Sequence, residues 1–209
     1  MALQAAETFK YKSADYFNKN AESFSDGVGG TWMVKMHRAI AERLANLEGE
    51  SVLDIGCGGG QLLGLILGQR EFEAAGLDIS AEMIELARRR LGRSVDLRTG
   101  DAEQLPWERN SFDLITCTFS FHHYPQPAKA LAEMRRVIRP GGRLILGEPN
   151  LPVPLRQLFN LLLPLSPSGD VRFYGRQELD KMLSQKGFYV EDWQRVNWWD
   201  CYLTALAVK

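Results

Sequence analysis

Short apolar runs and amphipathic segments alternate along the middle of the chain. The apolar runs are bounded by glycine, serine or aspartate, whereas the segments between them repeat apolar residues at steps of three and four, as helices do. Strands that alternate with helices on short connections imply parallel βαβ units in a doubly wound sheet. The predicted strands are Ser51–Gly56, Phe72–Ser80, Ser94–Asp101, Ser111–Phe121 and Arg143–Asn150, and the predicted helices are Gln61–Gln69, Ala81–Leu91 and Pro127–Ile138.

Different patterns flank this alternating region. Residues 1–48 are predicted to form two amphipathic helices separated by the glycine-rich stretch Ser25–Gly30. Beyond the last parallel strand, prolines bound an apolar helix over residues 153–165, and another helix covers Gly175–Phe188. The final segment alternates as two strands around a turn at Asn197–Asp200, and strands joined so closely must be antiparallel.

Composition narrows the possible classes of function. The 209 residues carry a net charge of −1, which argues against a basic surface for nucleic acid. Cys57, Cys117 and Cys201 form no CxxC or Cys/His pattern, so we expect unpaired thiols in a reducing compartment and no metal site. The N-terminus has no signal-peptide layout, and the longest apolar run, Leu158–Leu165, is too short to span a membrane. We therefore expect a cytoplasmic protein without a membrane span.

A cluster of glycines follows the first predicted strand in the stretch VLDIGCGGGQLL. Such a loop between a strand and a helix is typical of dinucleotide sites, where helix amides face the pyrophosphate. The G-x-G-x-x-G spacing is incomplete here, because Gln61 stands at the third glycine position. Asp54, near the end of the strand, would repel a pyrophosphate but suits a cationic group.

Two more aspartates end the next two predicted strands. Asp78 lies 20 residues after Gly58, the offset at which a carboxylate binds ribose hydroxyls. Asp101 can accept a hydrogen bond from an exocyclic amine. Together with Asp54, they imply a ligand with a cation, a ribose and an adenine-like base but no required phosphate. S-adenosylmethionine fits that description.

The motifs in series resemble those of class I S-adenosylmethionine-dependent methyltransferases, especially the small-molecule type that includes the ubiquinone/menaquinone methylases. The resemblance is carried by VLDIGCGGG, GLDIS, GDAEQLP, FDLITCTFSFHHYP and LAEMRRVIRPGGRLIL, in this order over about residues 50–148. It implies an α/β, Rossmann-like, seven-stranded and mostly parallel sheet whose last two strands form an antiparallel hairpin. It also implies a single domain over residues 1–209, with a helical lid (1–48), a cofactor-binding core (49–150) and a substrate side (151–209).

The resemblance also assigns roles on the methionine side of the cofactor. Asp54, Gly56 and Gly58 would line the methionine and ribose moieties, and Cys117 would lie where the fourth strand passes the methionine. The product formed there would be S-adenosylhomocysteine.

The resemblance places the adenosine end of the cofactor at the ends of the second and third predicted strands. Asp78 would bind the ribose hydroxyls, with Ile79 against the adenine. Asp101 and Ala102 would bind the amine edge of that base.

Two histidines follow the fourth predicted strand, at the mouth of the expected site. His122 and His123 are candidates for catalysis, because a hydroxyl acceptor must lose its proton and histidine is the usual base near neutral pH. The same pair occurs in relatives with different substrates, so a structural or cofactor-lining role stays open.

Aromatic side chains in the variable parts of the chain favour a small apolar or aromatic acceptor. The sequence leaves three alternatives open: an NAD-dependent oxidoreductase, which Asp54 and Gln61 oppose, a non-catalytic S-adenosylmethionine-binding protein, and different sulfonium chemistry at the same site. It also leaves open which atom of the acceptor is methylated and whether the chain forms a homodimer. The acceptor-site candidates are Tyr11, Tyr16, Phe17, Trp32, the helix over residues 153–165, Val171–Gly175 and the Asn197–Asp200 turn.

Overall fold

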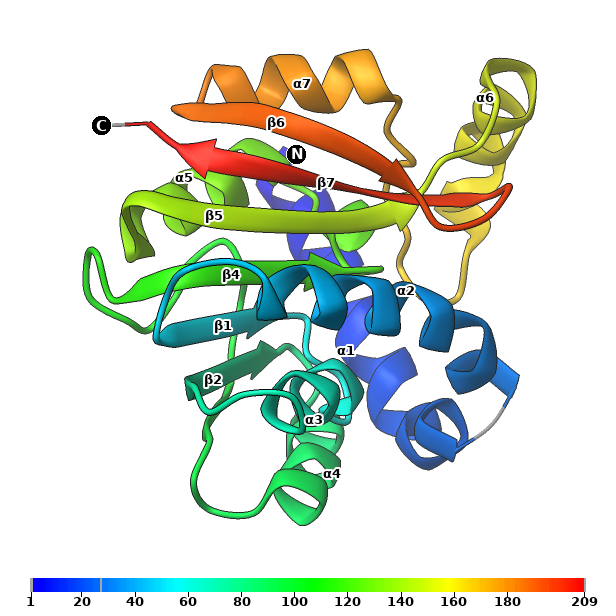
Figure 1. The fold of residues 1–209 in the computed structure, drawn as a ribbon. Helices are drawn as coiled ribbons and strands as arrows, with labels where there is room; N and C mark the ends of the chain where they lie inside the picture. The colour runs from blue at the N-terminus through cyan, green and yellow to red at the C-terminus, as the bar shows by residue number, and fades with distance from the viewer. Residues whose placement is uncertain (1, 27, 209) are drawn as a thin grey trace.

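A seven-stranded sheet forms the centre of the computed structural model, which describes residues 2–26 and 28–208 (Figure 1). Its strand order is β3-β2-β1-β4-β5-β7-β6. The first five strands are parallel, and β7 runs antiparallel between β5 and β6, which confirms the predicted architecture. The strands are β1 Ser51–Ile55, β2 Glu73–Asp78, β3 Asp96–Thr99, β4 Phe112–Thr118, β5 Ile138–Pro149, β6 Phe188–Arg195 and β7 Asp200–Ala207.

Helices cover both faces of the sheet, so each face has its own hydrophobic core. Apolar residues of α2, α3 and α4 pack on one face, and those of α5 and α7 pack on the other. Within β1, Val52 belongs to the first core, whereas Leu53 and Ile55 belong to the second, as the alternation of a strand requires. The helices are α1 Ala2–Asp26, α2 Val28–Ala45, α3 Gln61–Leu67, α4 Ala81–Leu91, α5 Pro127–Val137, α6 Val153–Leu162 and α7 Arg176–Ser184, with short 3₁₀ helices η1 Phe121–His123 and η2 Leu163–Leu165.

The predicted break between the two N-terminal helices falls between Asp26 and Val28. The intervening residue, and the side chains of residues 24–32, lie outside the described part of the chain, and Trp32 is among them. In α2, Met36, Ile40 and Leu44 are buried against the sheet, as the apolar spacing predicts. No helix in the described ranges combines the length and the apolarity needed to cross a bilayer.

Two predicted boundaries are wrong at the edges of β4 and β5. The fourth strand ends at Thr118 rather than Phe121, because Phe119 takes a φ of 51° and the chain then enters η1. The fifth strand begins at Ile138, not Arg143. Residues 139–142, between the predicted helix and the predicted strand, form an irregularity in the ladder, where the pairing shifts between Phe112 and Leu114.

Candidate functional site

A cavity of about 350 Å³ lies at the carboxyl ends of the parallel strands, under α1. This is the edge where open α/β sheets bind their ligands. Nine of the ten predicted site residues line it. They are Asp54, Gly56, Gly58, Asp78, Ile79, Asp101, Ala102, His122 and His123.

Cys117 is not on the cavity wall. Its side chain is fully buried in the core beneath α5, with Sγ 3.5 Å from the hydroxyl of Tyr124. The next residues along the chain, Thr118, Phe119 and Ser120, line the cavity instead. The sequence does not show which of these consecutive residues faces the cavity, because that depends on the residue at which the strand ends.

The glycine loop folds back over the end of β2 and is closed by Asp78. The amides of Gly56 and Cys57 both donate to the carbonyl of Leu77, and the Gly58 amide donates to Asp78 Oδ2 at 2.8 Å. Gly56 has a φ of 74°, and a Cβ there would lie 2.0 Å from Ser120 Oγ. A side chain at Gly56 is therefore excluded, because it would collide with the segment after β4.

Asp54 is almost completely buried beside this loop. Its Oδ1 accepts a hydrogen bond of 2.7 Å from Thr116 Oγ1. Burial raises the pKa of Asp54 to about 7, the bond from Thr116 opposes that rise, and the charge of Asp78 adds to it. A carboxyl group in this state gains most from a ligand that brings a positive charge.

The N-terminal helix reaches the cavity through Lys10. The Lys10 ammonium lies 2.7 Å from Asp101 Oδ2 and 2.6 Å from Glu103 Oε2. The other oxygen of Glu103 accepts from the Gln126 amide at 2.8 Å. These contacts tie α1 to the loop after β3, at the residue expected to bind the adenine amine.

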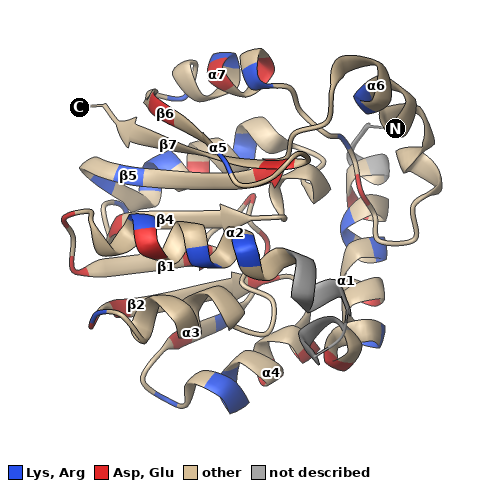
Figure 2. Cartoon of the chain, turned by 45° about the vertical axis from the view of Figure 1, so that its right-hand side comes forward, with Lys and Arg blue, Asp and Glu red and all other residues tan. Residues whose placement is uncertain are grey.

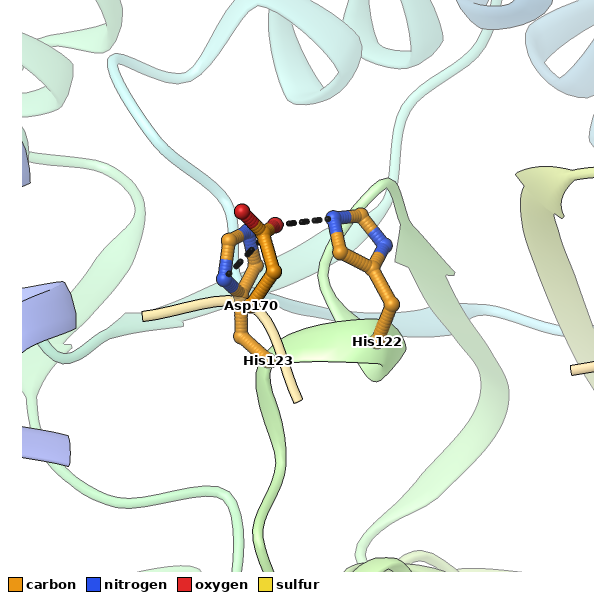
Figure 3. Close-up of side chains that lie close together, drawn as sticks. All are labelled: His122, His123 and Asp170. Carbon is orange, nitrogen blue, oxygen red and sulfur yellow. Dashed lines mark ion pairs between the residues drawn. The ribbon is translucent and has the colours of Figure 1, made fainter. Parts of the chain in front are cut away.

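A second set of charged groups surrounds the two histidines that line the cavity. The carboxylate of Asp170 stands between two imidazoles, 3.3 Å from Nε2 of His122 and 3.5 Å from Nδ1 of His123 (Figure 3). Nδ1 of His122 lies 2.6 Å from Glu148 Oε2, and the other Glu148 oxygen accepts from the amides of Ser120 and Phe121. His122 is thus held between two carboxylates.

These surroundings give the two histidines opposite charge states. Burial alone would lower the pKa of His122, but the charge of Glu148 and the bond with Asp170 outweigh it and raise that pKa to about 10. Burial and the adjacent charge of His122 lower the pKa of His123 to about 3. At neutral pH His122 is therefore an imidazolium, whereas His123 is a neutral ring.

The sequence reasoning missed Glu148, Asp170 and Lys10. Glu148 lies at the carboxyl end of β5, so the rule that selected Asp54 and Asp78 would have selected it too. Asp170 lies in the segment between η2 and α7, where no local pattern marks it. Lys10 is a surface-type residue in a helical pattern, and only the packing of α1 brings it to the cavity.

The three cysteines are free, as predicted, and all three are buried. Cys57 follows the first glycine of the loop and lines the cavity. Burial, together with the charges of Asp78 and Asp54, raises the pKa of its thiol well above the ordinary value.

The wall of the cavity fits a cationic nucleoside ligand. Asp54, Asp78 and Asp101 lie at or just beyond the carboxyl ends of three adjacent strands, and carboxylates accept hydrogen bonds from amines and vicinal hydroxyls. Thr118 Oγ1 is buried at the same wall and has no hydrogen-bond partner among the described residues. A polar atom in that position is available to a bound molecule.

His122, His123 and Asp170 could also hold a metal ion. Each offers one ligand atom, and these atoms lie within 4.8 Å of one another. A ligating imidazole must be deprotonated, so a cation would have to displace the proton that Glu148 and Asp170 hold on His122. The expectation of no metal stays a prediction.

Comparison with known proteins identifies the family. A methyltransferase domain model matches residues 53–146. A demethylmenaquinone methyltransferase of Deinococcus radiodurans is 39% identical over 132 residues, which are 61% of this chain and 53% of that protein. The uncharacterized methyltransferase YcgJ of Bacillus subtilis is 32% identical over 194 residues, 87% of this chain and 73% of that protein.

A solved structure agrees with these sequence matches at the level of the fold. The S-adenosylmethionine-dependent methyltransferase of Aquifex aeolicus superposes with a TM-score of 0.65 at 22% identity, over 82% of this chain and 89% of that one. Fold and cavity together define an α/β protein with a nucleoside-type site at the carboxyl edge of its sheet. The chain belongs to the S-adenosylmethionine-dependent methyltransferases, and their cofactor is the ligand that this site fits. It spans between 39% and 59% of the length of four curated relatives that it matches.

The raised pKa of Asp54 gives a testable pH dependence of cofactor binding. Because a carboxyl with a pKa of about 7 must ionise to bind a cation, affinity for S-adenosylhomocysteine should fall by up to about tenfold per pH unit below 7. Titration calorimetry between about pH 5.5 and 7.5 measures this, below the pKa of the amino group of the ligand. Asp54→Asn should bind more weakly and lose most of the slope, and an unchanged slope in that variant would contradict the assignment.

Proposed function

We propose that this chain transfers the methyl group of S-adenosylmethionine to a small, apolar or aromatic molecule through a hydroxyl-type acceptor atom. The observation that carries the proposal is that one cavity joins the three acidic strand ends to the histidine cluster. A cofactor held by Asp54, Asp78 and Asp101 would thus share its space with the neutral ring of His123, which can receive a proton. A protein that only binds the cofactor would need the acidic strand ends but not the histidine cluster.

The residues divide between binding and proton transfer. When bound, the cofactor supplies a methyl group on a good leaving group, so alignment of the acceptor provides much of the acceleration. The neutral ring of His123 receives the acceptor proton, and the adjacent carboxylate of Asp170 stabilises the charge that forms on that ring. His122, already protonated, keeps Asp170 in place.

The acceptor class follows from the remaining wall of the cavity. Tyr16 and Phe17 of α1 line it, together with Phe173 from the segment before α7. Phe17 packs edge-on against His123, with ring centroids 5.4 Å apart. Aromatic faces of this kind favour a flat apolar acceptor and attract the positive charge of a sulfonium. Tyr11 and the tip of the β6–β7 hairpin, also candidates, are exposed and off the wall.

The N-terminal helices act in this proposal as a lid. Lys10, Tyr16 and Phe17 reach from α1 to the cavity, so exchange of the cofactor requires α1 to move. The ion pairs of Lys10 with Asp101 and Glu103 hold the closed position, and opening breaks both.

The test begins with thermal unfolding in the presence of S-adenosylmethionine, S-adenosylhomocysteine or NAD. A ligand at about 100 times its dissociation constant adds about 2.7 kcal/mol, which raises Tm by several degrees for a chain of this size. We expect a shift with the two adenosyl compounds only. Turnover to S-adenosylhomocysteine is then measured with phenols, quinols and amines. A shift with NAD alone would overturn the cofactor assignment, and binding without turnover on any of these acceptors would favour a non-catalytic protein.

A further inference from the structure

Helix α6 presents its apolar side to solvent. Leu158, Leu161 and Leu165 follow one another at steps of three and four, so they share one face of α6 and η2, and they are 55%, 75% and 82% exposed. Asn160 points inward instead, because it donates to the carbonyl of Phe173 and accepts from its amide. An ordinary surface helix has the reverse arrangement.

Two exposed tryptophans adjoin this face. Trp198 and Trp199 form the tip of the β6–β7 hairpin and are 83% and 53% exposed. The carbonyl of Trp199 accepts a 2.5 Å hydrogen bond from the amide of Asn150, three residues before α6 begins. The hairpin tip therefore lies beside the segment that leads into α6. We use the name leucine–tryptophan surface for the exposed apolar residues at this end of the molecule, which are Leu158, Leu161, Leu162, Leu165, Trp198 and Trp199.

The charges around this surface are basic. No aspartate or glutamate occurs from Leu151 to Gly169, and Figure 2 shows basic but no acidic colour on α6. Arg156 adds a positive charge to α6, where its half-buried side chain donates to the carbonyl of Leu151 at 3.4 Å. Arg195 is exposed at the end of β6, next to the hairpin tip, and has no ion pair within the described part of the chain. A partner with negative charges around an apolar interior would match this surface.

We propose that the leucine–tryptophan surface binds the interface of a lipid bilayer that contains anionic lipids. Exposed leucines on one helical face enter such an interface, tryptophan is favoured at its boundary, and arginines attract its headgroups. A symmetric contact between two copies would instead bring the same arginines together, with no acidic residue from the α6 segment to balance them.

The surface is connected to the cavity through two aromatic rings. Phe159 of α6 packs against Phe173, with ring centroids 6.5 Å apart, and Phe173 lies 5.2 Å from His122 and lines the cavity. A lipophilic acceptor could thus pass from the bilayer to the cavity along apolar contacts. This part of the inference rests on the proposed function, whereas membrane binding itself does not.

Vesicle flotation with the full chain tests the proposal. The chain should float with vesicles of phosphatidylcholine and phosphatidylglycerol, less with phosphatidylcholine alone, and less at high salt. The Leu161→Glu/Leu165→Glu variant should lose at least about tenfold in partitioning. Tyr189→Glu/Val208→Glu is the matched control, because it places the same two charges on exposed apolar positions at the opposite end of the β6–β7 hairpin and should bind normally.

Tryptophan fluorescence locates the contact. Emission should shift to shorter wavelength on mixing with anionic vesicles, and Trp198→Phe/Trp199→Phe should remove that shift. Binding that survives the leucine substitutions, or no binding to either vesicle, would overturn the proposal. A dimer in solution that the leucine substitutions convert to a monomer would assign the surface to a second copy.

An assay of methyl transfer to a water-soluble acceptor, without vesicles, distinguishes a failure of the membrane-binding proposal from a failure of the proposed function. The leucine variant should keep that activity, since none of its substituted residues lines the cavity. Vesicle binding without any methylation would support the membrane-binding surface and contradict the proposed function. Methylation without vesicle binding would support the proposed function and contradict the membrane-binding surface.

Discussion

Asp78→Ala is expected to weaken the binding of S-adenosylhomocysteine about 100-fold. The carboxylate would lose its bonds to the ribose hydroxyls, and hydrogen bonds to a charged group contribute about 1.5–3 kcal/mol each. The glycine loop would also be less ordered, because the variant lacks the carboxylate that accepts from the amides of Gly58 and Ser80 at 2.8 and 2.9 Å. Titration calorimetry at constant pH measures the change.

Asp96→Ala is the matched control for that experiment. Asp96 begins the neighbouring strand β3 at the opposite edge of the sheet, where it bonds to Arg98 and Trp107 rather than to the cavity. The control should lower the stability of the fold and leave the dissociation constant unchanged. Equal losses of affinity in the two variants would mean that Asp78 acts through the fold and not through the ligand.

His123→Ala is expected to reduce kcat by about 10²-fold for a hydroxyl acceptor, the low end of the usual contribution of a general base, because a ring with a pKa of about 3 is a weak base. Cofactor affinity should change little, because the acidic strand ends remain. The wild-type kcat should stay flat from about pH 5 to pH 8, since the pKa of His123, about 3, lies below that range. Steady-state kinetics and a pH profile check both expectations, and added imidazole should restore part of the lost rate.

His37→Ala offers the comparison within the same cavity. His37 lines the wall from α2, and burial lowers its pKa to about 4, so it is also a neutral ring. No carboxylate is paired with it in the described part of the chain, unlike His123 beside Asp170. A variant of His37 that loses as much kcat as His123→Ala would argue that the cavity needs both rings for packing alone.

The sequence predicted the features that depend on local patterns. Ser80 precedes α4 and is of a residue type favoured at helix N-caps, and its hydroxyl accepts from the Met83 amide at 3.1 Å. The strand ends carrying Asp54, Asp78 and Asp101 were found because parallel strands bring their carboxyl ends to one edge. Asp170 was not found, because it meets the histidines only after α6 and η2 return the chain to the cavity.

Periodicity also leaves the direction of a helical face undetermined. The apolar spacing of α6 is the same whether that face points inward or outward, so its assignment to the acceptor pocket was a reasonable hypothesis. The structure turns Asn160 inward and the leucines outward. Only the packing of Phe173 against the rest of the chain reveals this orientation.

The burial of Cys57 has a consequence for the fidelity of the reaction. A sulfonium methyl group is an electrophile, and a thiolate beside it would compete with the intended acceptor. Because burial and two neighbouring carboxylates keep the sulfur of Cys57 protonated, the wall of the cavity offers no strong sulfur nucleophile at that position. Under the proposed function, the same acidic residues that suit the cofactor would thus protect the protein from alkylating itself.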